Sequence, residues 1–161
     1  MVIILMGVSG SGKTTVGRLL ASQLGWQFYE GDDFHPQANI DKMQQGIPLT
    51  DDDRWPWLAA LRAVIDLCSA QGTNAVLVCS ALKQSYRDYL MRDHHEITLV
   101  YLKGTYDLLY QRLAQRQGHF MPKDLLISQF ATLEEPQQGL TVDVANAPER
   151  LVAEVRQALQ V

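Results

Sequence analysis

Unbroken apolar runs indicate where the chain forms strands. Val2 to Met6 reads VIILM, and this run of apolar, mostly β-branched residues is typical of a strand buried on both faces of a parallel sheet. Residues 75–79 (AVLVC) and 97–102 (ITLVYL) show the same pattern, and shorter strands are expected at 27–29 and near 141–144. The chain is therefore expected to contain five strands.

Between these runs, apolar residues recur at helical spacing. Val16, Leu19, Leu20 and Leu24 follow the first strand in this way, and Gly25 comes next as a cap. Further helices are expected at about 57–70, 85–92, 105–116, 122–133 and 148–159. Alternating strands and helices predict an α/β fold of three layers, with a central parallel sheet flanked by helices. The 161 residues suit one domain spanning 1–161.

Residues 7–14, GVSGSGKT, join the first strand to the first helix and fit the pattern G-x-x-x-x-G-K-[ST] of a phosphate-binding loop. The glycines let the backbone close around phosphates, Lys13 is expected to reach the β- and γ-phosphates, and the Thr14 hydroxyl is expected to ligate Mg²⁺. A glycine-rich turn with a chance lysine is the alternative. The strand before the loop and the helix after it favour a nucleotide site in a P-loop NTPase fold.

Composition narrows the class of nucleotide-binding protein. The chain is too short for most motors and multidomain ATPases, and its net charge of −4 predicts neither nucleic acid nor a membrane as a partner. Cys68 and Cys79 lie in apolar stretches without C-x-x-C spacing, so reduced, buried thiols are expected. These features together predict a cytoplasmic protein.

Acidic residues follow the second strand, at the sheet edge where the phosphate loop opens. In parallel sheets ligands bind beyond the carboxyl ends of strands, so residues 30–36 (EGDDFHP) are candidates for an acceptor site. A kinase that phosphorylates a hydroxyl needs a carboxylate to orient that hydroxyl and accept its proton. Asp32 is the first choice and Asp33 the reserve, whereas an acidic turn is the structural alternative. His35 is equally compatible with a substrate contact and a surface position.

Three cations near a strand end or a helix start are candidates for binding an anionic substrate. Arg54 follows a helix start at Thr50 or a neighbouring Asp, where it opposes the helix dipole; its partner is either a substrate or one of two nearby aspartates. Lys83 and Arg87 are one helical turn apart after the third strand and are expected to point at one anionic group, with a solvated basic face as the alternative. Ser80 stands where many phosphate-loop proteins carry a Mg²⁺-supporting aspartate.

A segment with two arginines and a glycine is expected to form a mobile lid at approximately 112–124. Arg112 and Arg116 lie at the end of a predicted helix, and Gly118 follows as a hinge. A closing lid excludes water and brings positive charge to the transferring phosphoryl group. The arginines also complement the negative end of the helix, so both roles remain open. After the last strand, Asn146 to Pro148 could supply backbone contacts to adenine.

These motifs, in order and spacing through about Pro136, resemble those of the bacterial gluconate kinase (gluconokinase) family, whose fold is similar to that of shikimate kinase. The stretches that carry the resemblance are the loop at 7–14, GDDFHP, GIPLTDDDRWPWL, VCSALKQSYRD, YLKG, RLAQRQGHFMP and LLISQFATLEEP. The resemblance implies Mg-ATP as cofactor, D-gluconate as a substrate phosphorylated on its 6-hydroxyl, and a homodimer. It also implies that Asp32 is the carboxylate nearest the acceptor hydroxyl.

The predicted site residues follow from the motifs and the resemblance together. The catalytic residues are Lys13, Asp32 and Arg116, and the Mg²⁺ ligand is Thr14. The substrate-binding residues are Asp32, His35, Arg54, Lys83 and Arg87. The nucleotide-binding residues are Gly7, Ser9, Gly10, Ser11, Gly12, Lys13, Thr14, Thr15, Arg112, Arg116 and Pro148. The alternatives are a kinase of the same fold for shikimate or a nucleoside monophosphate, and a nucleotide-binding regulatory module.

Overall fold

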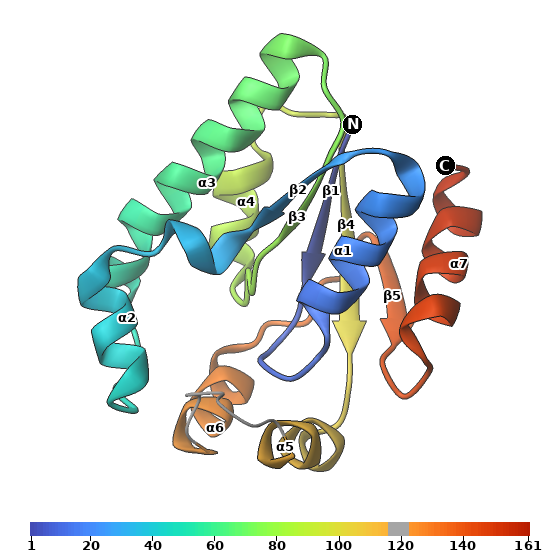
Figure 1. The fold of residues 1–161 in the computed structure, drawn as a ribbon. Coiled ribbons are helices and arrows are strands. Elements are labelled where there is room, and N and C mark those ends of the chain that lie inside the picture. The colour runs from blue at the N-terminus through green and yellow to red at the C-terminus, as the bar shows by residue number, and fades with distance from the viewer. Residues whose placement is uncertain (116–122) are drawn as a thin grey trace.

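A computed structural model describes residues 1–115 and 123–161, and it places five parallel strands in one sheet (Figure 1). The strand order is β2-β3-β1-β4-β5, so β1 lies in the centre. The strands are β1 (Val2–Met6), β2 (Gln27–Glu30), β3 (Ala75–Val78), β4 (Ile97–Lys103) and β5 (Leu140–Asp143). All residues of β1 and β3 are buried, as their unbroken apolar runs predict.

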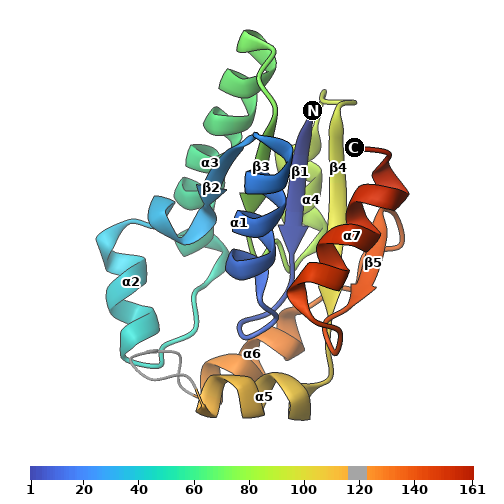
Figure 2. The same cartoon turned by 45° about the vertical axis from the view of Figure 1, so that its right-hand side comes forward.

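Helices cover both faces of the sheet and complete the three predicted layers (Figures 1 and 2). Helices α1 (Lys13–Leu24) and α7 (Pro148–Leu159) cover one face, and α3 (Asp51–Gln71) and α4 (Gln84–Met91) cover the other. Side chains of β1 alternate between the two cores: Ile3 and Leu5 face α1 and α7, whereas Ile4 and Met6 face α3 and α4. The predicted α/β fold with a central parallel sheet is therefore confirmed.

The remaining helices lie near the carboxyl ends of the strands. A short 3₁₀ turn, η1 (Gly31–Phe34), and α2 (Gln37–Gln44) follow β2. Helices α5 (Tyr106–Ala114) and α6 (Lys123–Thr132) lie beyond the arrowheads of β1 and β4 in Figure 1. The expected lid at 112–124 falls mostly on residues outside the described part of the chain.

The sequence analysis missed α2 because this helix has no apolar stripe. Its sequence is QANIDKMQ, and its single buried residue is Asn39. Helix α3 starts at Asp51, which agrees with the helix start expected at Thr50 or a neighbouring Asp, although the apolar periodicity indicated only residues 57–70. Thr50 is its N-cap: the Asp53 backbone N–H donates to the Thr50 hydroxyl, and the Thr50 backbone N–H donates to the Asp53 carboxylate.

The expectation for the cysteines is met. Cys68 and Cys79 are buried, free thiols. Among the helices of residues 1–115 and 123–161, none is both long enough and apolar enough to cross a membrane.

Candidate active site

The loop between β1 and α1 has the backbone of an anion-binding site. Gly10 and Gly12 adopt φ values of 82° and 86°, in the left-handed region that favours glycine. The loop ends at the N-terminus of α1, where backbone N–H groups and the helix dipole favour negative charge. The Lys13 ammonium donates to the carbonyl oxygens of Gly7 and Val8 at 2.9 and 3.1 Å, so it lies against the loop rather than in solvent.

Other loop residues differ in accessibility. Ser11 is 1% exposed, and its hydroxyl has no hydrogen-bond partner among the described residues. Thr15 is exposed on the first turn of α1.

The Ser9 backbone N–H donates to the side-chain carbonyl of Gln129, 2.8 Å away on α6. This contact was not predicted, because nothing in the sequence links α6 to the phosphate loop.

Glu30 lies beside the predicted metal ligand, although the sequence analysis assigned it no role. The Thr14 hydroxyl donates to the Glu30 carboxylate at 2.5 Å. Burial raises the pKa of Glu30, while the hydrogen bond from Thr14 opposes the rise. Ser80 lies two residues beyond the end of β3, and its backbone carbonyl oxygen accepts a hydrogen bond from the Gly7 N–H. In the described ranges, no group of three or more His, Cys, Asp or Glu residues is arranged to hold a metal.

A small pocket brings the phosphate loop and the predicted acceptor residues together. Its volume is about 60 Å³. The residues that line it are Ser9, Lys13, Asp32, His35, Met43, Pro48, Leu49, Arg54, Trp57, Ser80, Leu82, Leu125, Ser128 and Gln129. Asp32 is in this lining, whereas Asp33 is not.

The backbone that carries Asp32 is fixed by tight packing at Gly31. A Cβ atom on Gly31 would lie 2.3 Å from the carbonyl oxygen of Val78 in β3, so no larger residue fits without a backbone shift. The Trp57 indole N–H donates to the Gly31 carbonyl at 2.7 Å. Trp57 is 1% exposed in α3, and the turn η1 is therefore held against both β3 and α3.

His35 is stacked on Trp57 at the wall of the pocket. The two rings lie 4.2 Å apart with an angle of 12° between their planes. Burial lowers the pKa of His35 to about 4; the Asp32 charge opposes this shift and the Arg54 charge reinforces it. The imidazole is therefore neutral near pH 7.

Arg54 is held by the ring and hydroxyl of a tyrosine rather than by an aspartate. Its guanidinium donates to the Tyr86 hydroxyl at 3.1 Å and lies 5.6 Å from the centre of that ring. The Tyr86 hydroxyl in turn donates to Asp51. Asp51 pairs with Lys83 at 2.9 Å, and Asp53 pairs with Lys42 at 2.8 Å. The two aspartates considered as partners of Arg54 are thus each paired with a lysine.

Lys83 and Arg87 do not point at one anionic group, so this expectation is wrong. Lys83 precedes α4 and reaches Asp51, whereas Arg87 is 2% exposed and donates to the carbonyl oxygens of Ala81, Leu82 and Glu134. Burial lowers the pKa of Arg87. Its guanidinium supports the loop after β3 and the segment after α6, and it is absent from the lining of the small pocket.

Two of the predicted nucleotide-binding residues outside the phosphate loop, Arg112 and Pro148, lie in the described part of the chain. Arg112, in the last turn of α5, donates to the carbonyl oxygen of Val144 at 2.5 Å. This contact places Arg112 against the turn that leads to Pro148, the first residue of α7. Arg116 lies outside the described residues.

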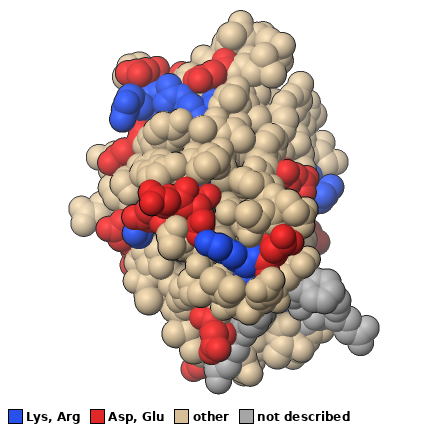
Figure 3. All heavy atoms as spheres, turned by 90° about the vertical axis from the view of Figure 1, so that its left-hand side faces the viewer, with Lys and Arg blue, Asp and Glu red and all other residues tan. Residues whose placement is uncertain are grey.

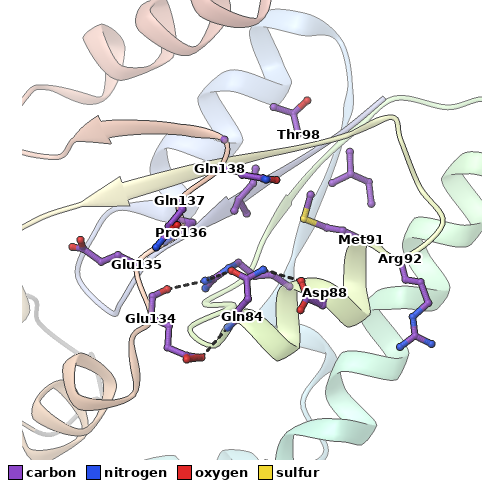
Figure 4. Close-up of a pocket in the computed structure, with 14 residues that line it drawn as sticks. Gln84, Asp88, Met91, Arg92, Thr98, Glu134, Glu135, Pro136, Gln137 and Gln138 are labelled. Atoms are coloured by element: carbon purple, nitrogen blue, oxygen red, sulfur yellow. Dashed lines mark hydrogen bonds between the residues drawn. The ribbon is translucent and has the colours of Figure 1, made fainter.

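A larger hollow lies elsewhere, between α4, β4 and the segment before β5 (Figure 4). Its volume is about 1040 Å³, and its lining includes Gln84, Asp88, Met91, Arg92 and Thr98. None of its lining residues belongs to the phosphate loop or to η1, so it is separate from the candidate active site.

Acidic and basic side chains are interspersed on the surface beside α2 and α3 (Figure 3). Lys42, Lys83 and Arg62 each form an ion pair, with Asp53, Asp51 and Asp66 respectively. This face therefore carries no broad basic patch, consistent with the net charge of −4.

The chain is similar to known proteins over most of its length. Residues 2–139 match the family described as an AAA domain. A probable gluconokinase from Mus musculus is 45% identical over 99% of this chain and 97% of its own length. A gluconokinase from Gluconobacter oxydans is 52% identical over 83% of this chain and 75% of its own length.

Two solved structures are similar to this chain. A gluconokinase from Sinorhizobium meliloti is 44% identical, with a TM-score of 0.85 over 98% of this chain and 94% of that chain. An APS kinase from Mycobacterium tuberculosis has a TM-score of 0.73 over 99% of this chain and 97% of that chain. At 20% identity, this second similarity concerns the fold alone.

Proposed function

The chain belongs to the gluconokinase family of P-loop kinases, and we propose that it transfers the γ-phosphoryl group of ATP to the 6-hydroxyl of D-gluconate, giving 6-phospho-D-gluconate. The single observation that carries this proposal is the pocket in which Lys13 and Ser9 of the phosphate loop line the same space as Asp32, His35 and Arg54. A phosphoryl donor and an acceptor hydroxyl must meet in such a space.

The phosphate loop and the α5–β5 region form the proposed nucleotide side. The backbone of residues 7–15 surrounds the phosphates, and Lys13 leaves the loop carbonyls to neutralise charge on the β- and γ-phosphates. Arg112 and the turn before Pro148 face the adenine end of the nucleotide. Arg116 remains a predicted catalytic contact to the γ-phosphate.

The oxygen atoms at Thr14 and Glu30 fit a magnesium ion. Mg²⁺ prefers oxygen ligands and usually binds through one or two protein groups together with nucleotide phosphates. The Thr14 hydroxyl and the Glu30 carboxylate are adjacent, and a bound cation would favour the ionised form of Glu30. When bound, the ion supplies charge neutralisation at the phosphates. We therefore add Glu30 to Thr14 in the proposed metal site.

The acceptor side provides one carboxylate and several groups for a sugar acid. Asp32 orients the 6-hydroxyl and accepts its proton as the phosphoryl group is transferred. Arg54 provides positive charge in the pocket, and His35 provides a neutral polar edge. Lys83 is outside the lining and pairs with Asp51, so its predicted contact with the substrate would require that ion pair to open. Arg87 acts indirectly, because its buried guanidinium holds the loop after β3.

The test of this function is a coupled assay of ADP release with a panel of acceptors. The panel contains D-gluconate, glucose, shikimate and nucleoside monophosphates. We expect gluconate to give by far the highest kcat/KM, and glucose to be poor because it lacks the carboxylate that pairs with the cations of the pocket.

Each alternative has its own signature in this assay. A preference for shikimate or for a nucleoside monophosphate would identify a kinase of the same fold with another acceptor. A basal ATPase rate that no acceptor raises would identify a nucleotide-binding regulatory module. Equal efficiency on gluconate and glucose would show that the acid group is not recognised.

Two further features are proposed on the family resemblance. The protein acts as a homodimer in the cytoplasm, with a small-molecule substrate rather than nucleic acid or membrane as its partner. Sedimentation of the purified protein measures the oligomeric state independently of activity.

A further inference from the structure

Asn39 is a buried polar residue on a helix whose other residues are more exposed. It is 3% exposed on α2 and lies next to the acceptor pocket without lining it. Its amide nitrogen donates to the carbonyl oxygen of Asp53 at 2.8 Å and lies 3.1 Å from Nδ1 of His35. Because buried polar groups need hydrogen-bond partners, one orientation of the Asn39 amide has to satisfy both contacts.

The contact with Asp53 determines which form of His35 fits. A backbone carbonyl oxygen only accepts hydrogen bonds, so the end of the Asn39 side chain that faces it must be the NH₂ group. The second hydrogen of this NH₂ group is then directed at His35 Nδ1, which must accept it. A neutral imidazole that accepts at Nδ1 carries its proton on Nε2. A charged imidazolium would place two donors against one another.

The position of the ring determines where the Nε2–H group points. The stack on Trp57 fixes the plane of the His35 ring, and a 180° flip within that plane would put a carbon atom in place of Nδ1 and break the Asn39 contact. Nε2 is separated from Nδ1 by Cε1, so its N–H bond diverges from the contact with Asn39, and His35 lines the acceptor pocket with Asp32 and Arg54. The charges around the ring are Asp32 from η1 and Arg54 from α3, whereas α2 contributes the neutral Asn39 and a lysine, Lys42, that pairs with Asp53.

We propose that Asn39 is a positioning residue that holds His35 in the neutral Nε2–H tautomer, so that His35 donates a hydrogen bond to an oxygen atom of the sugar acid. The identity of the ligand rests on the proposed function, whereas the tautomer does not. A histidine fixed as a donor does not compete with Asp32 for the proton of the acceptor hydroxyl. Asn39 thus keeps His35 as a residue that binds the sugar acid and leaves Asp32 as the group that accepts the proton.

The direct test is the nitrogen-15 NMR spectrum of the histidine rings in the free protein near pH 7. We expect His35, assigned by loss of its signals in His35→Gln, to show a protonated Nε2 and an unprotonated Nδ1. In Asn39→Leu, which has similar size but no amide, we expect a mixture of tautomers. An Nδ1–H or imidazolium form of His35 in the unsubstituted protein would overturn the proposal.

Kinetics test the consequence for binding. Asn39→Leu is expected to raise the KM for gluconate up to about tenfold, the loss of about one hydrogen bond, and to leave the KM for ATP unchanged. Lys42→Met is the matched control, because Lys42 ties the same helix to the same Asp53 without contacting His35. If Lys42→Met raises the KM for gluconate equally, Asn39 only anchors α2 and the proposal is wrong.

A double-mutant cycle separates action through His35 from a general effect on the fold. In His35→Gln the amide keeps a donor on the pocket side, so adding Asn39→Leu should no longer change the KM for gluconate. An undiminished effect in that background would contradict the proposal. A protein that shows the expected tautomer but does not phosphorylate gluconate would refute the proposed function and leave the tautomer assignment intact.

Discussion

Lys13 lies inside the phosphate loop through its hydrogen bonds to Gly7 and Val8. These bonds hold the ammonium in the loop that we propose binds the phosphates. Its energetic contribution to the fold is small, because the side chain is partly exposed and outside both hydrophobic cores. Its role in catalysis and its role in stability can therefore be separated by substitution.

Lys13→Ala is expected to lower kcat by roughly a hundred- to a thousandfold, because an electrostatic contact to the transferring phosphoryl group is lost. The melting temperature should change little. Steady-state rates at saturating ATP and gluconate measure the first effect, and a thermal melt measures the second. Lys103→Ala, at an exposed lysine that pairs with Glu135, serves as control and should retain full activity. Near-normal turnover in folded Lys13→Ala would exclude this role.

At the residue scale, the sequence locates groups whose role depends on a local motif. Lys13 ends the loop after β1, and Asp32 lies in the turn after β2. Both residues line one pocket, as expected for residues that follow the carboxyl ends of strands in a parallel sheet. Contacts between distant segments could not be predicted. The bond from Ser9 to Gln129 joins residues 120 positions apart, and Arg87 bonds to the carbonyl of a residue 47 positions away.

At the scale of elements, Trp57 joins α3 to η1 and so positions Asp32. The indole N–H bond to Gly31 is buried, and its loss would leave a buried carbonyl oxygen without this donor. The same indole supports the ring of His35. One side chain of α3 therefore holds two acceptor residues in place.

Trp57→Phe is expected to lower the free energy of unfolding by about 1–3 kcal/mol, the cost of an unsatisfied buried polar group. It should also raise the KM for gluconate more than the KM for ATP, since Trp57 bonds to Gly31 and stacks on His35 on the acceptor side of the pocket. Urea unfolding and steady-state kinetics measure the two effects. Trp55→Phe is the control, because Trp55 is 38% exposed on the same helix. Equal effects of the two substitutions on gluconate binding would contradict this account.

Elements were predictable where burial imposes an apolar pattern on the sequence. The strands β1 and β3 are buried on both faces and appear as apolar runs. Helix α2 has no such period because its contacts are polar: Asn39 bonds to Asp53, and Lys42 pairs with Asp53. A helix held by hydrogen bonds and an ion pair leaves no hydrophobic pattern to detect.

At the scale of the whole molecule, two histidines give the stability opposite dependences on pH. Hydrogen bonds to Asp66 and Glu96 raise the pKa of His94, whereas burial lowers that of His35 to about 4. His94 therefore contributes stability that is present below the ordinary histidine pKa of about 6.5 and is lost as the pH rises through its folded value. His35 contributes stability that is present above about 6.5 and is lost as the pH falls towards 4.

We expect His94→Gln to remove part of the decrease in unfolding free energy that occurs as the pH rises above about 6.5. His35→Gln should instead remove part of the decrease between about pH 6.5 and pH 5. Urea unfolding of the three proteins across this range measures both effects. The prediction for His94 fails if the unsubstituted protein and His94→Gln have parallel pH profiles above about 6.5.

The overall fold was predictable because alternating strands and helices restrict the chain to few arrangements. The order β2-β3-β1-β4-β5 is not a local property, since it depends on which crossovers pack best against the sheet. That order places the carboxyl end of β1 beside those of β3 and β4, with β2 next to β3. It brings the loop after β1 and the turn after β2 to one pocket, which is the basis of the proposed reaction.

The most direct test of the account is the turnover of Asp32→Asn and Asp33→Asn at saturating ATP and gluconate. Asparagine keeps the size of aspartate but does not accept the proton, and loss of a general base typically costs about a hundred- to ten-thousandfold. The loose transition state of phosphoryl transfer favours the lower part of that range. Asp32→Asn should therefore lose at least about a hundredfold in kcat, with an unchanged melting temperature, and Asp33→Asn should stay close to the unsubstituted enzyme. A crippled Asp33→Asn beside a nearly normal Asp32→Asn would contradict the assignment of Asp32 as the base.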